Sequence, residues 1–279
     1  MTLVVVGANG QLGRALRRAR PDAVALGRDD LDVTDPAAVL GRDWSGVDAI
    51  VNAAAWTAVD AAEDPANHAA VRAVNVEAVA SLAEVARRTG AVLVHVSSEY
   101  VFDGRHRGPM PEDLPPSPTS VYGRSKADGD REARAVERHY VVRTSWVVGD
   151  GRNFVRTMAG LAARGVSPGV VDDQVGRPTS ANDLAAGILH LLDVRAPHGT
   201  YNLTGSGEPV SWADVAAATF AASGRSPDDV RRVSTAEYFA EQPGAAPRPL
   251  NSVLDLTRIT AAGFPPRHWT ATLDEQLRG

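Results

Sequence analysis

Residues 3–13, LVVVGANGQLG, join an apolar segment directly to a glycine-rich turn. Residues 3–6 are continuously apolar, as expected of a parallel strand that is buried on both faces. Gly7 suits a tight turn, Gly10 lets the backbone approach a pyrophosphate, and Gly13 lets the next helix pack closely on the strand. The spacing is G-x-x-G-x-x-G, and glycines also serve in turns with a purely structural role. Because this turn follows an opening strand and begins a helix, we interpret it as a dinucleotide-binding turn.

The first half of the chain continues this alternation of strand and helix. Further strands are predicted from apolar segments at residues 24–26, 49–51, 92–96 and 140–142, and helical spacing marks residues 69–88 and 211–223. Such alternation predicts an α/β fold with a Rossmann-type doubly wound parallel sheet. We expect residues 1–148 to form an NAD(P)-binding Rossmann domain. Residues 149–279 should form mainly a smaller C-terminal substrate-binding lobe, with some segments returning to the Rossmann domain, over the carboxyl ends of the strands.

The composition is that of a water-soluble globular protein. The 279 residues carry 29 Lys and Arg against 34 Asp and Glu, a formal charge of −5, and every cation except Lys126 is an arginine. This balance argues against a nucleic-acid partner, which normally requires a basic excess. There is no cysteine, and hence no disulfide or thiolate site. No apolar run reaches the ~18–20 residues of a membrane span, and no signal peptide follows Met1. We therefore expect a cytoplasmic protein with no membrane partner.

The single lysine, Lys126, lies four residues after Tyr122, so the two side chains share one face of a predicted helix. A tyrosine, with a reference pKa of ~10, exchanges protons poorly near neutral pH unless a positive charge stabilises its anion. An ammonium group does this and can also bind the ribose of a nicotinamide nucleotide. Ser98 follows the strand at residues 92–96 and can orient a substrate carbonyl against Tyr122. We interpret Ser98, Tyr122 and Lys126 as catalytic residues, with Ser97 as the weaker candidate for the role of the serine.

The end of the second strand bears on the choice of cofactor. NAD sites usually place an acidic residue there, which accepts hydrogen bonds from the adenosine ribose. Here the strand is followed by Gly27 and Arg28, and a guanidinium suits a 2′-phosphate. We therefore expect NADPH as the cofactor, with NADH as the other possibility. The alternative interpretation is that Arg28 pairs with Asp29 or Asp30 and gives no such preference.

Metal chemistry has little support in the sequence. The seven histidines show no helical i, i+4 pair and no adjacent acidic cluster, so we expect no metal site. His95 lies inside an apolar strand, where a buried structural histidine is the simpler interpretation. Trp44, Trp212 and Trp269 are interpreted as packing residues.

Longer motifs make the chain resemble the extended short-chain dehydrogenase/reductases, and within them the dTDP-4-dehydrorhamnose reductase family. The resemblance covers nearly the whole chain. Its carriers are the glycine turn, VNAAAWTAVD at residues 51–60, SSEYVFDG at 97–104, VYG at 121–123 with Lys126, RTSWV at 143–147, DQVGRPT at 173–179 and RPLNS at 248–252. Together these motifs are far more specific than the glycine turn alone.

The resemblance implies a role for particular residues. Those expected to bind the cofactor are Gly7, Asn9, Gly10, Gln11, Leu12, Gly13, Arg28, Asp32, Val33, Ala53, Ala55, Trp56, Thr57, Tyr122 and Lys126. Those expected to bind the substrate, a nucleotide sugar, are Ser98, Glu99, Tyr122, Trp146, Asn153 and Arg248. Ser98 would tune Tyr122 and bind the keto oxygen, while Glu99 and Trp146 would meet the deoxysugar. Asn75 would either support the lysine through water or be a plain polar residue of its helix.

The implied reaction transfers a hydride from NADPH to the C4 ketone of a nucleotide-activated 4-keto-6-deoxysugar, with Tyr122 supplying the proton. The expected conversion is that of dTDP-4-dehydrorhamnose to dTDP-L-rhamnose. Two departures leave open a related, dihydrostreptose-like 4-ketoreductase of natural-product deoxysugar biosynthesis. Ser98-Glu99 stands where the family usually has Thr-Asp, and Trp56 stands where histidine or tyrosine is common. A third alternative is a non-catalytic NADP-binding regulatory subunit of a methionine adenosyltransferase, against which the intact Tyr122 and Lys126 count.

The assembly is expected to be a monomer or a homodimer. Some members of the resembled family dimerise around a metal held by glutamates of the first helix. Arg14 and Ala15 occupy that part of the helix here, which argues against this mode of assembly.

Overall fold

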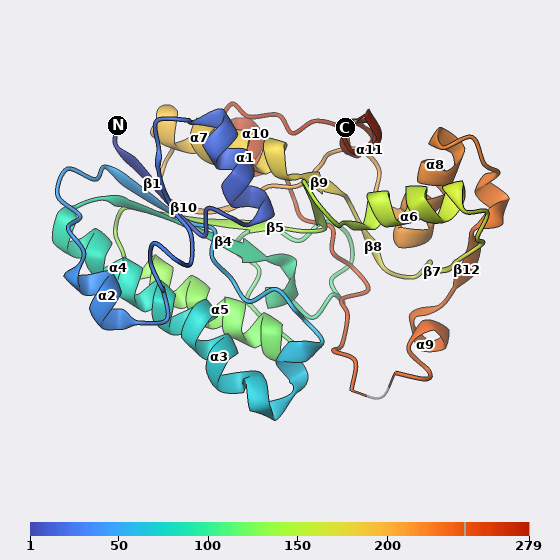
Figure 1. Ribbon diagram of the computed structural model, residues 1–279, viewed down its shortest axis with the longest axis horizontal. Coiled ribbons are helices and arrows are strands. Elements are labelled where there is room, and N and C mark those ends of the chain that lie inside the picture. Colours follow the sequence, from blue (N-terminus) through green and yellow to red (C-terminus); the bar gives the residue numbers. More distant parts are fainter. Residues whose placement is uncertain (243, 279) are drawn as a thin grey trace.

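A six-stranded parallel sheet forms the centre of the protein (Figure 1). The computed structural model describes residues 1–242 and 244–278. In order across the sheet the strands are β10 (Gly199–Asn202), β5 (His139–Thr144), β4 (Val92–Ser98), β3 (Ala49–Asn52), β1 (Leu3–Val6) and β2 (Val24–Leu26). Every neighbouring pair is parallel, and the strand order changes direction between β1 and β3. The predicted Rossmann-type sheet is confirmed, and its last strand, β10, comes from the second half of the chain.

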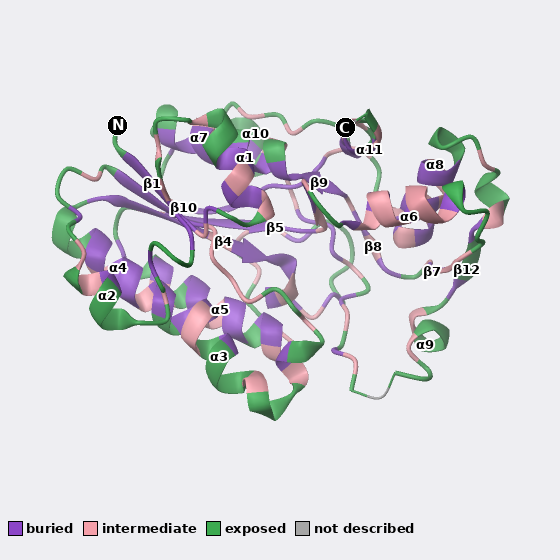
Figure 2. Ribbon diagram, in the orientation of Figure 1, coloured by how far each residue is buried: buried purple, intermediate pink, exposed green. Residues whose placement is uncertain are grey.

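Helices cover both faces of the sheet, and each face has its own apolar core (Figure 2). One face carries α1 (Gln11–Ala19), α7 (Ala181–Asp193) and α10 (Thr257–Ala261), which pack on strand residues such as Val5 and Val51. The other face carries α2 (Pro36–Gly41), α4 (Ala78–Thr89) and α5 (Val121–Arg134), which pack on Val4 and Ile50. Because successive strand residues point to opposite faces, this double covering favours strands with apolar residues on both faces, as in β1 and most of β3.

The helix predicted over residues 69–88 is interrupted in the structure. α3 (His68–Arg72) passes into a π-helical turn (Ala73–Glu77) and then into α4. Asn75 of this turn is buried, and its side-chain oxygen accepts a hydrogen bond from Trp56 N at 2.9 Å. Trp56 belongs to the loop after β3, so the wider turn holds that loop in place. Short 3₁₀ turns occupy Ala61–Glu63, Pro65–Asn67, Glu99–Val101 and Pro227–Asp229.

The second half of the chain adds a smaller group of elements beside the sheet (Figure 1). Its helices are α6 (Phe154–Ala163), α8 (Trp212–Ala222), α9 (Thr235–Tyr238) and α11 (Trp269–Arg278). Its short strands pair as β6 (Val147–Val148) with β9 (Thr179–Ser180), β7 (Gly169–Val171) with β12 (Arg231–Val233), and β8 (Val175–Gly176) with β11 (Val210–Ser211). An apolar cluster that includes Met158 and Phe220 holds α6 and α8 together. Within the described ranges, no helix combines the length and apolar character needed to cross a bilayer.

A buried ion pair fixes α5 against the sheet. Arg143 on β5 is fully buried, and its Nε lies 3.2 Å from Asp130 Oδ2 on α5. The guanidinium also donates to the Glu112 carbonyl at 3.0 Å and lies over the Phe102 ring. Asp130 is one helical turn beyond Lys126, so the ion pair sets the position of that lysine relative to the sheet.

Replacing Asp130 with alanine is expected to lower the free energy of unfolding by ~3–5 kcal/mol, because Arg143 would stay buried without its counter-charge. Urea denaturation followed by circular dichroism measures this change. The control Glu84→Ala breaks the surface ion pairs with Arg87 and Arg88 and should leave the denaturation midpoint nearly unchanged. If Asp130→Ala destabilised the protein no more than the control, the buried pair would not be what fixes α5.

Candidate active site

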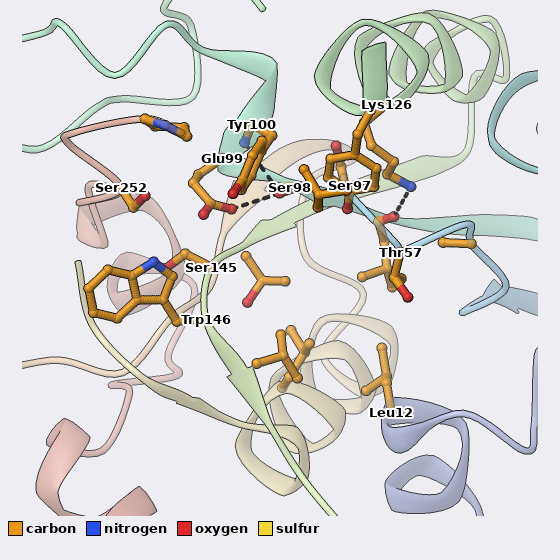
Figure 3. Close-up of a pocket in the computed structure, with 18 of the residues that line it drawn as sticks. Leu12, Thr57, Ser97, Ser98, Glu99, Tyr100, Lys126, Ser145, Trp146 and Ser252 are labelled. Atoms are coloured by element: carbon orange, nitrogen blue, oxygen red, sulfur yellow. Dashed lines mark hydrogen bonds between the residues drawn. The ribbon is translucent and has the colours of Figure 1, made fainter. Parts of the chain in front are cut away.

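Two adjoining hollows lie at the carboxyl ends of the strands. The larger has a volume of about 570 Å³ and the smaller about 480 Å³. Both are lined by Gly10, Ala53 and Ala55, so they form one cleft that meets at the glycine turn. The predicted site residues that line the larger hollow are Gly10, Gln11, Leu12, Ala53, Ala55, Thr57, Ser98, Glu99, Tyr122, Lys126, Trp146 and Arg248 (Figure 3). Those that line the smaller one are Gly7, Asn9, Gly10, Arg28, Asp32, Val33, Ala53, Ala55 and Trp56.

The glycine turn has the shape that a pyrophosphate requires. Gly7 has φ = +79°, and a Cβ at this position would lie 2.5 Å from Ala54 N. Gly13 packs so closely that a Cβ there would lie 2.3 Å from the Gly7 carbonyl oxygen. Gly10, in contrast, is open to the cleft and is the N-cap of α1, with no side chain bonded to the first N–H groups of the helix. Such N–H groups at a helix N-terminus bind anionic phosphates.

Asp32 lies in the smaller hollow, where the adenosine end of a dinucleotide is expected. Its carboxylate accepts hydrogen bonds from Thr34 N at 2.9 Å and Thr34 Oγ1 at 2.6 Å. These hydrogen bonds lower the pKa of Asp32 below its ordinary value. The carboxylate therefore stays ionised and holds the loop that follows β2 in a defined conformation.

Arg28 lines the same hollow without a carboxylate partner. Its neighbour Asp30 accepts a hydrogen bond from Gly27 N at 2.8 Å. In residues 1–242 and 244–278 no carboxylate oxygen lies within 4.0 Å of the Arg28 guanidinium, although its charge contributes to lowering the pKa of Asp32. A guanidinium in this state can bind a phosphate through two parallel hydrogen bonds.

The structure brings Ser98, Tyr122 and Lys126 together in the larger hollow. Ser98 is the last residue of β4, and the other two lie one turn apart on α5. Lys126 Nζ donates a hydrogen bond to the Val96 carbonyl at 2.8 Å. The sheet therefore fixes the ammonium from one side, while the helix supplies both the phenol and the lysine.

The pKa values of Tyr122 and Lys126 are strongly shifted. Burial lowers the pKa of the Lys126 ammonium to about 8, and the carboxylate of Asp130 acts in the opposite direction. Burial raises the pKa of the Tyr122 phenol, and the charge of Glu99 raises it further, whereas a hydrogen bond with Ser98 lowers it. The resting site is therefore a protonated phenol beside an ammonium at neutral pH.

His95 is the buried neighbour of Lys126. Its Nε2 lies 3.5 Å from Nζ, and its Nδ1 lies 3.4 Å from Asn52 Nδ2. Burial and the charge of Lys126 lower the pKa of His95 well below its ordinary value, so the imidazole is neutral. Asn75 makes no direct contact with the lysine, because its amide donates to Ser125 Oγ at 2.9 Å and holds the loop after β3.

Glu99 and Trp146 lie at the end of the larger hollow remote from Leu12 and Thr57 (Figure 3). Glu99 is only 2% exposed, and its Oε2 lies 2.7 Å from Ser98 Oγ. Burial raises the pKa of Glu99 to about 7. Arg248 also lines the hollow, but its guanidinium is bound to both carboxylate oxygens of Asp60 at 2.7 Å.

An aromatic pair forms the wall at this end. Trp146 has φ = +48°, a left-handed conformation that is uncommon outside glycine, and stacks on Trp212 with the ring centroids 3.8 Å apart. Trp212 begins α8 and packs on the apolar cluster between α6 and α8, in agreement with its interpretation as a packing residue, and it also lines the hollow. The position of Trp212 depends on how α8 packs against α6, and no local pattern in the sequence predicts that packing. A flat aromatic wall suits a sugar ring or a nucleobase.

Asn153, for which contact with substrate was predicted, is not among the residues that line either hollow. Its Oδ1 accepts a hydrogen bond from Arg156 N at 3.0 Å, which caps α6. Its Nδ2 donates to the Gly149 carbonyl at 2.7 Å and to Gln276 Oε1 at 2.9 Å. The amide is fully used in joining α6 to α11. Gly13 also lies outside the lining, because it packs against the strand side of the turn.

Further residues line the larger hollow. They are Val59, Val96, Ser97, Tyr100, Thr144, Ser145, Val147, Gln174, Leu184, Trp212, Pro249 and Ser252. Among them, Ser97 was predicted only as the weaker candidate for the catalytic serine and Trp212 only as a packing residue, and the others were given no role. Most of them lie within the motifs that carry the resemblance, which is the only signal of them in the sequence. Among the residues that the structure describes, no three His, Cys, Asp or Glu side chains cluster closely enough to hold a metal ion.

Comparison with known proteins places the chain in a family. Residues 1–279 match the family described as RmlD substrate binding domain. A dTDP-4-dehydrorhamnose reductase from Streptomyces griseus is 42% identical, with 98% of this chain and 92% of that protein covered. A probable dTDP-4,6-dihydroxy-2-methyloxan-3-one 4-ketoreductase from Streptomyces antibioticus is 41% identical, with 99% and 94% covered.

The likeness extends to three dimensions. The crystal structure of a dTDP-4-dehydrorhamnose reductase from Bacillus anthracis in complex with NADP has a TM-score of 0.89 to this chain. The two are 30% identical, and 100% of this chain and 99% of that chain are covered. Sequence, fold and site geometry agree, and the chain belongs to the RmlD substrate binding domain family.

Proposed function

We propose that this chain is an NADPH-dependent reductase that converts dTDP-4-dehydrorhamnose to dTDP-L-rhamnose. The observation that carries the proposal is the convergence of Ser98, Tyr122 and Lys126 in a hollow that adjoins the glycine turn. A reductase needs a proton donor beside the site of hydride transfer, and this arrangement supplies it. The Streptomyces griseus relative, which matches nearly the whole chain, bears the name of this activity.

The smaller hollow and the glycine turn would hold NADPH. The N–H groups that follow Gly10 would bind the pyrophosphate, and Arg28 would bind the 2′-phosphate. Asp32 and Val33 would flank the adenosine. When bound, the cofactor supplies the hydride that reduces the ketone. The relative from Bacillus anthracis, solved in complex with NADP, supports this choice of cofactor.

Tyr122 is the residue that would give a proton to the keto oxygen as that oxygen gains negative charge. Lys126 would stabilise the tyrosinate left behind, because its ammonium lies one turn along the same helix and is fixed by the Val96 carbonyl. Ser98 would hold the keto oxygen against Tyr122. The small side chains of Ala53 and Ala55 leave room between the turn and these residues for the two reacting groups to meet.

The remote end of the larger hollow would bind the deoxysugar and its nucleotide. Glu99 and Trp146 lie there, and Trp212 extends the aromatic wall. Arg248 would contribute positive potential near a pyrophosphate, although its guanidinium is already bound to Asp60. The substrate diphosphate can share this cation with the carboxylate or displace it.

A reductase of another nucleotide-linked 4-keto-6-deoxysugar is the second candidate. The Streptomyces antibioticus relative, 41% identical, favours it. The two candidates share every catalytic step and differ only in the sugar reduced. Comparing kcat/KM for dTDP-4-dehydrorhamnose with that for other dTDP-4-keto-6-deoxyhexoses separates them, since our proposal requires the first to be the best substrate. A purely regulatory NADP-binding protein would not need Ser98, Tyr122 and Lys126 in one hollow.

Tyr122→Phe is expected to lower kcat for NADPH oxidation with dTDP-4-dehydrorhamnose by ~10²–10⁴-fold, because the proton donor is lost while the ring remains. Affinity for NADPH, measured by fluorescence titration, and the thermal midpoint should stay near those of the wild type. The control Tyr238→Phe removes a hydroxyl from an exposed tyrosine on α9 and should keep the wild-type rate. A Tyr122→Phe enzyme that kept full rate would contradict this mechanism.

Arg28→Ala is expected to lower kcat/KM for NADPH by roughly 10–100-fold, the effect of losing a charged hydrogen bond worth ~1.5–3 kcal/mol. The value for NADH should change little, because NADH has no 2′-phosphate. The control Arg131→Ala removes an exposed arginine of α5 that pairs with Asp128, and it should change neither value. Equal losses with the two cofactors would show that Arg28 does not contact the 2′-phosphate.

A further inference from the structure

The hydroxyl of Ser98 can form only a few hydrogen bonds, and several neighbouring groups compete for them. A serine hydroxyl has one proton to donate and two lone pairs with which to accept. Tyr100 N donates to Ser98 Oγ at 3.2 Å and occupies one lone pair. Glu99 Oε2 lies 2.7 Å from the same oxygen. Tyr122 lines the same hollow, and hydrogen bonding to Ser98 lowers the pKa of its phenol. The direction of the Ser98–Glu99 hydrogen bond therefore decides whether Ser98 presents a lone pair or its proton to the cavity.

With Glu99 ionised, the carboxylate can only accept, so the single proton of Ser98 is committed to it. What remains on the cavity side is a lone pair, which attracts the proton of Tyr122. A ketone is also only an acceptor, so in this state Ser98 cannot bind it. The phenol proton is then directed toward Ser98 and away from the position of the keto oxygen.

With Glu99 protonated, the direction reverses. The carboxyl group donates to Ser98 Oγ, and both lone pairs of the serine are occupied, one by Glu99 and one by Tyr100 N. The proton of Ser98 is then free to bond the keto oxygen, and Tyr122 can aim its own proton at the same atom. Loss of the negative charge of Glu99 also favours release of the phenol proton.

We propose that Glu99 is a positioning residue whose protonated carboxyl group turns the Ser98 hydroxyl toward the keto oxygen of the substrate. The inference rests on the proposed function, because it requires a ketone in the larger hollow. The enzyme then has two forms, which differ by one proton on Glu99 and not on Tyr122 or Lys126. The form with neutral Glu99 is the one that reduces the ketone.

The surroundings of Glu99 allow both forms near neutral pH. The charged and titratable side chains that share its hollow are Tyr100, Tyr122, Lys126 and Arg248. Arg248 is bound to Asp60 and Lys126 to the Val96 carbonyl, and in the described part of the chain neither forms an ion pair with Glu99. Both tyrosines stay protonated, since burial raises the pKa of each. Burial without a counter-charge raises the pKa of Glu99 to about 7.

The test compares the wild type with Glu99→Gln across pH. The amide of glutamine donates a hydrogen bond at every pH, so this variant should mimic the protonated carboxyl group. The ratio of wild-type to variant kcat/KM for dTDP-4-dehydrorhamnose is expected to fall about tenfold between pH 6 and pH 8, as for one titrating group in the free enzyme. Taking the ratio cancels the titration of Lys126, which is common to both proteins. Glu99→Ala, which lacks a donor, should be slower than Glu99→Gln at every pH.

A second measurement needs no turnover. Infrared difference spectra of the free protein should show the carbonyl stretch of a buried protonated carboxyl group that disappears as the pH rises through about 7, and that is missing from Glu99→Gln. A constant activity ratio between active wild type and variant, or a Glu99 that is already ionised at pH 5, would overturn the inference. No NADPH oxidation with any dTDP-4-keto-6-deoxyhexose would instead overturn the proposed function on which it rests.

Discussion

The position of the Lys126 ammonium inside the protein is the constraint on which the rest of the site depends. Removing an ion from water costs several kcal/mol unless partners replace the solvent. Here the Val96 carbonyl and the charge of Asp130 replace the solvent around the ammonium. Asp130 is in turn held by its ion pair with Arg143 on β5. This chain of contacts runs from the sheet to α5 and places the phenol one turn before the lysine. All other cations of the chain are arginines, and a guanidinium is too broad to replace the compact ammonium at this point.

The features that could be predicted from the sequence are those that depend on neighbours along the chain. The glycine turn, the buried strands and the four-residue spacing of Tyr122 and Lys126 each follow from local geometry, and the structure places them as expected. Asn153 and Trp212 behave otherwise. Both stand at helix starts in the second half, where packing between helices decides which side chain reaches the hollow. The sequence around a helix start does not show whether a residue there caps the helix, as Asn153 does, or lines a cavity, as Trp212 does.

The cleft also explains how two ligands of different kinds could meet. Its two hollows join at Gly10, Ala53 and Ala55, where small residues leave the backbone exposed. Polar and aromatic residues gather away from this junction, with Arg28 on one side and the Trp146–Trp212 pair on the other. Binding groups are thus distributed at the ends, while the chemistry is confined to the middle, beside Tyr122. The pair Ser98-Glu99, in place of the Thr-Asp usual in the resembled family, links these two parts. Ser98 lies with Tyr122 and Lys126, and Glu99 lies toward the Trp146 end.

The most direct test of the account follows the hydride itself. The protein would be incubated with dTDP-4-dehydrorhamnose and NADPH that carries deuterium in the transferable position at C4 of the nicotinamide. The product would then be analysed by mass spectrometry and proton NMR. We expect dTDP-L-rhamnose with a single deuterium at C4 of the sugar. A product without deuterium at that carbon, or no reduced sugar at all, would contradict it.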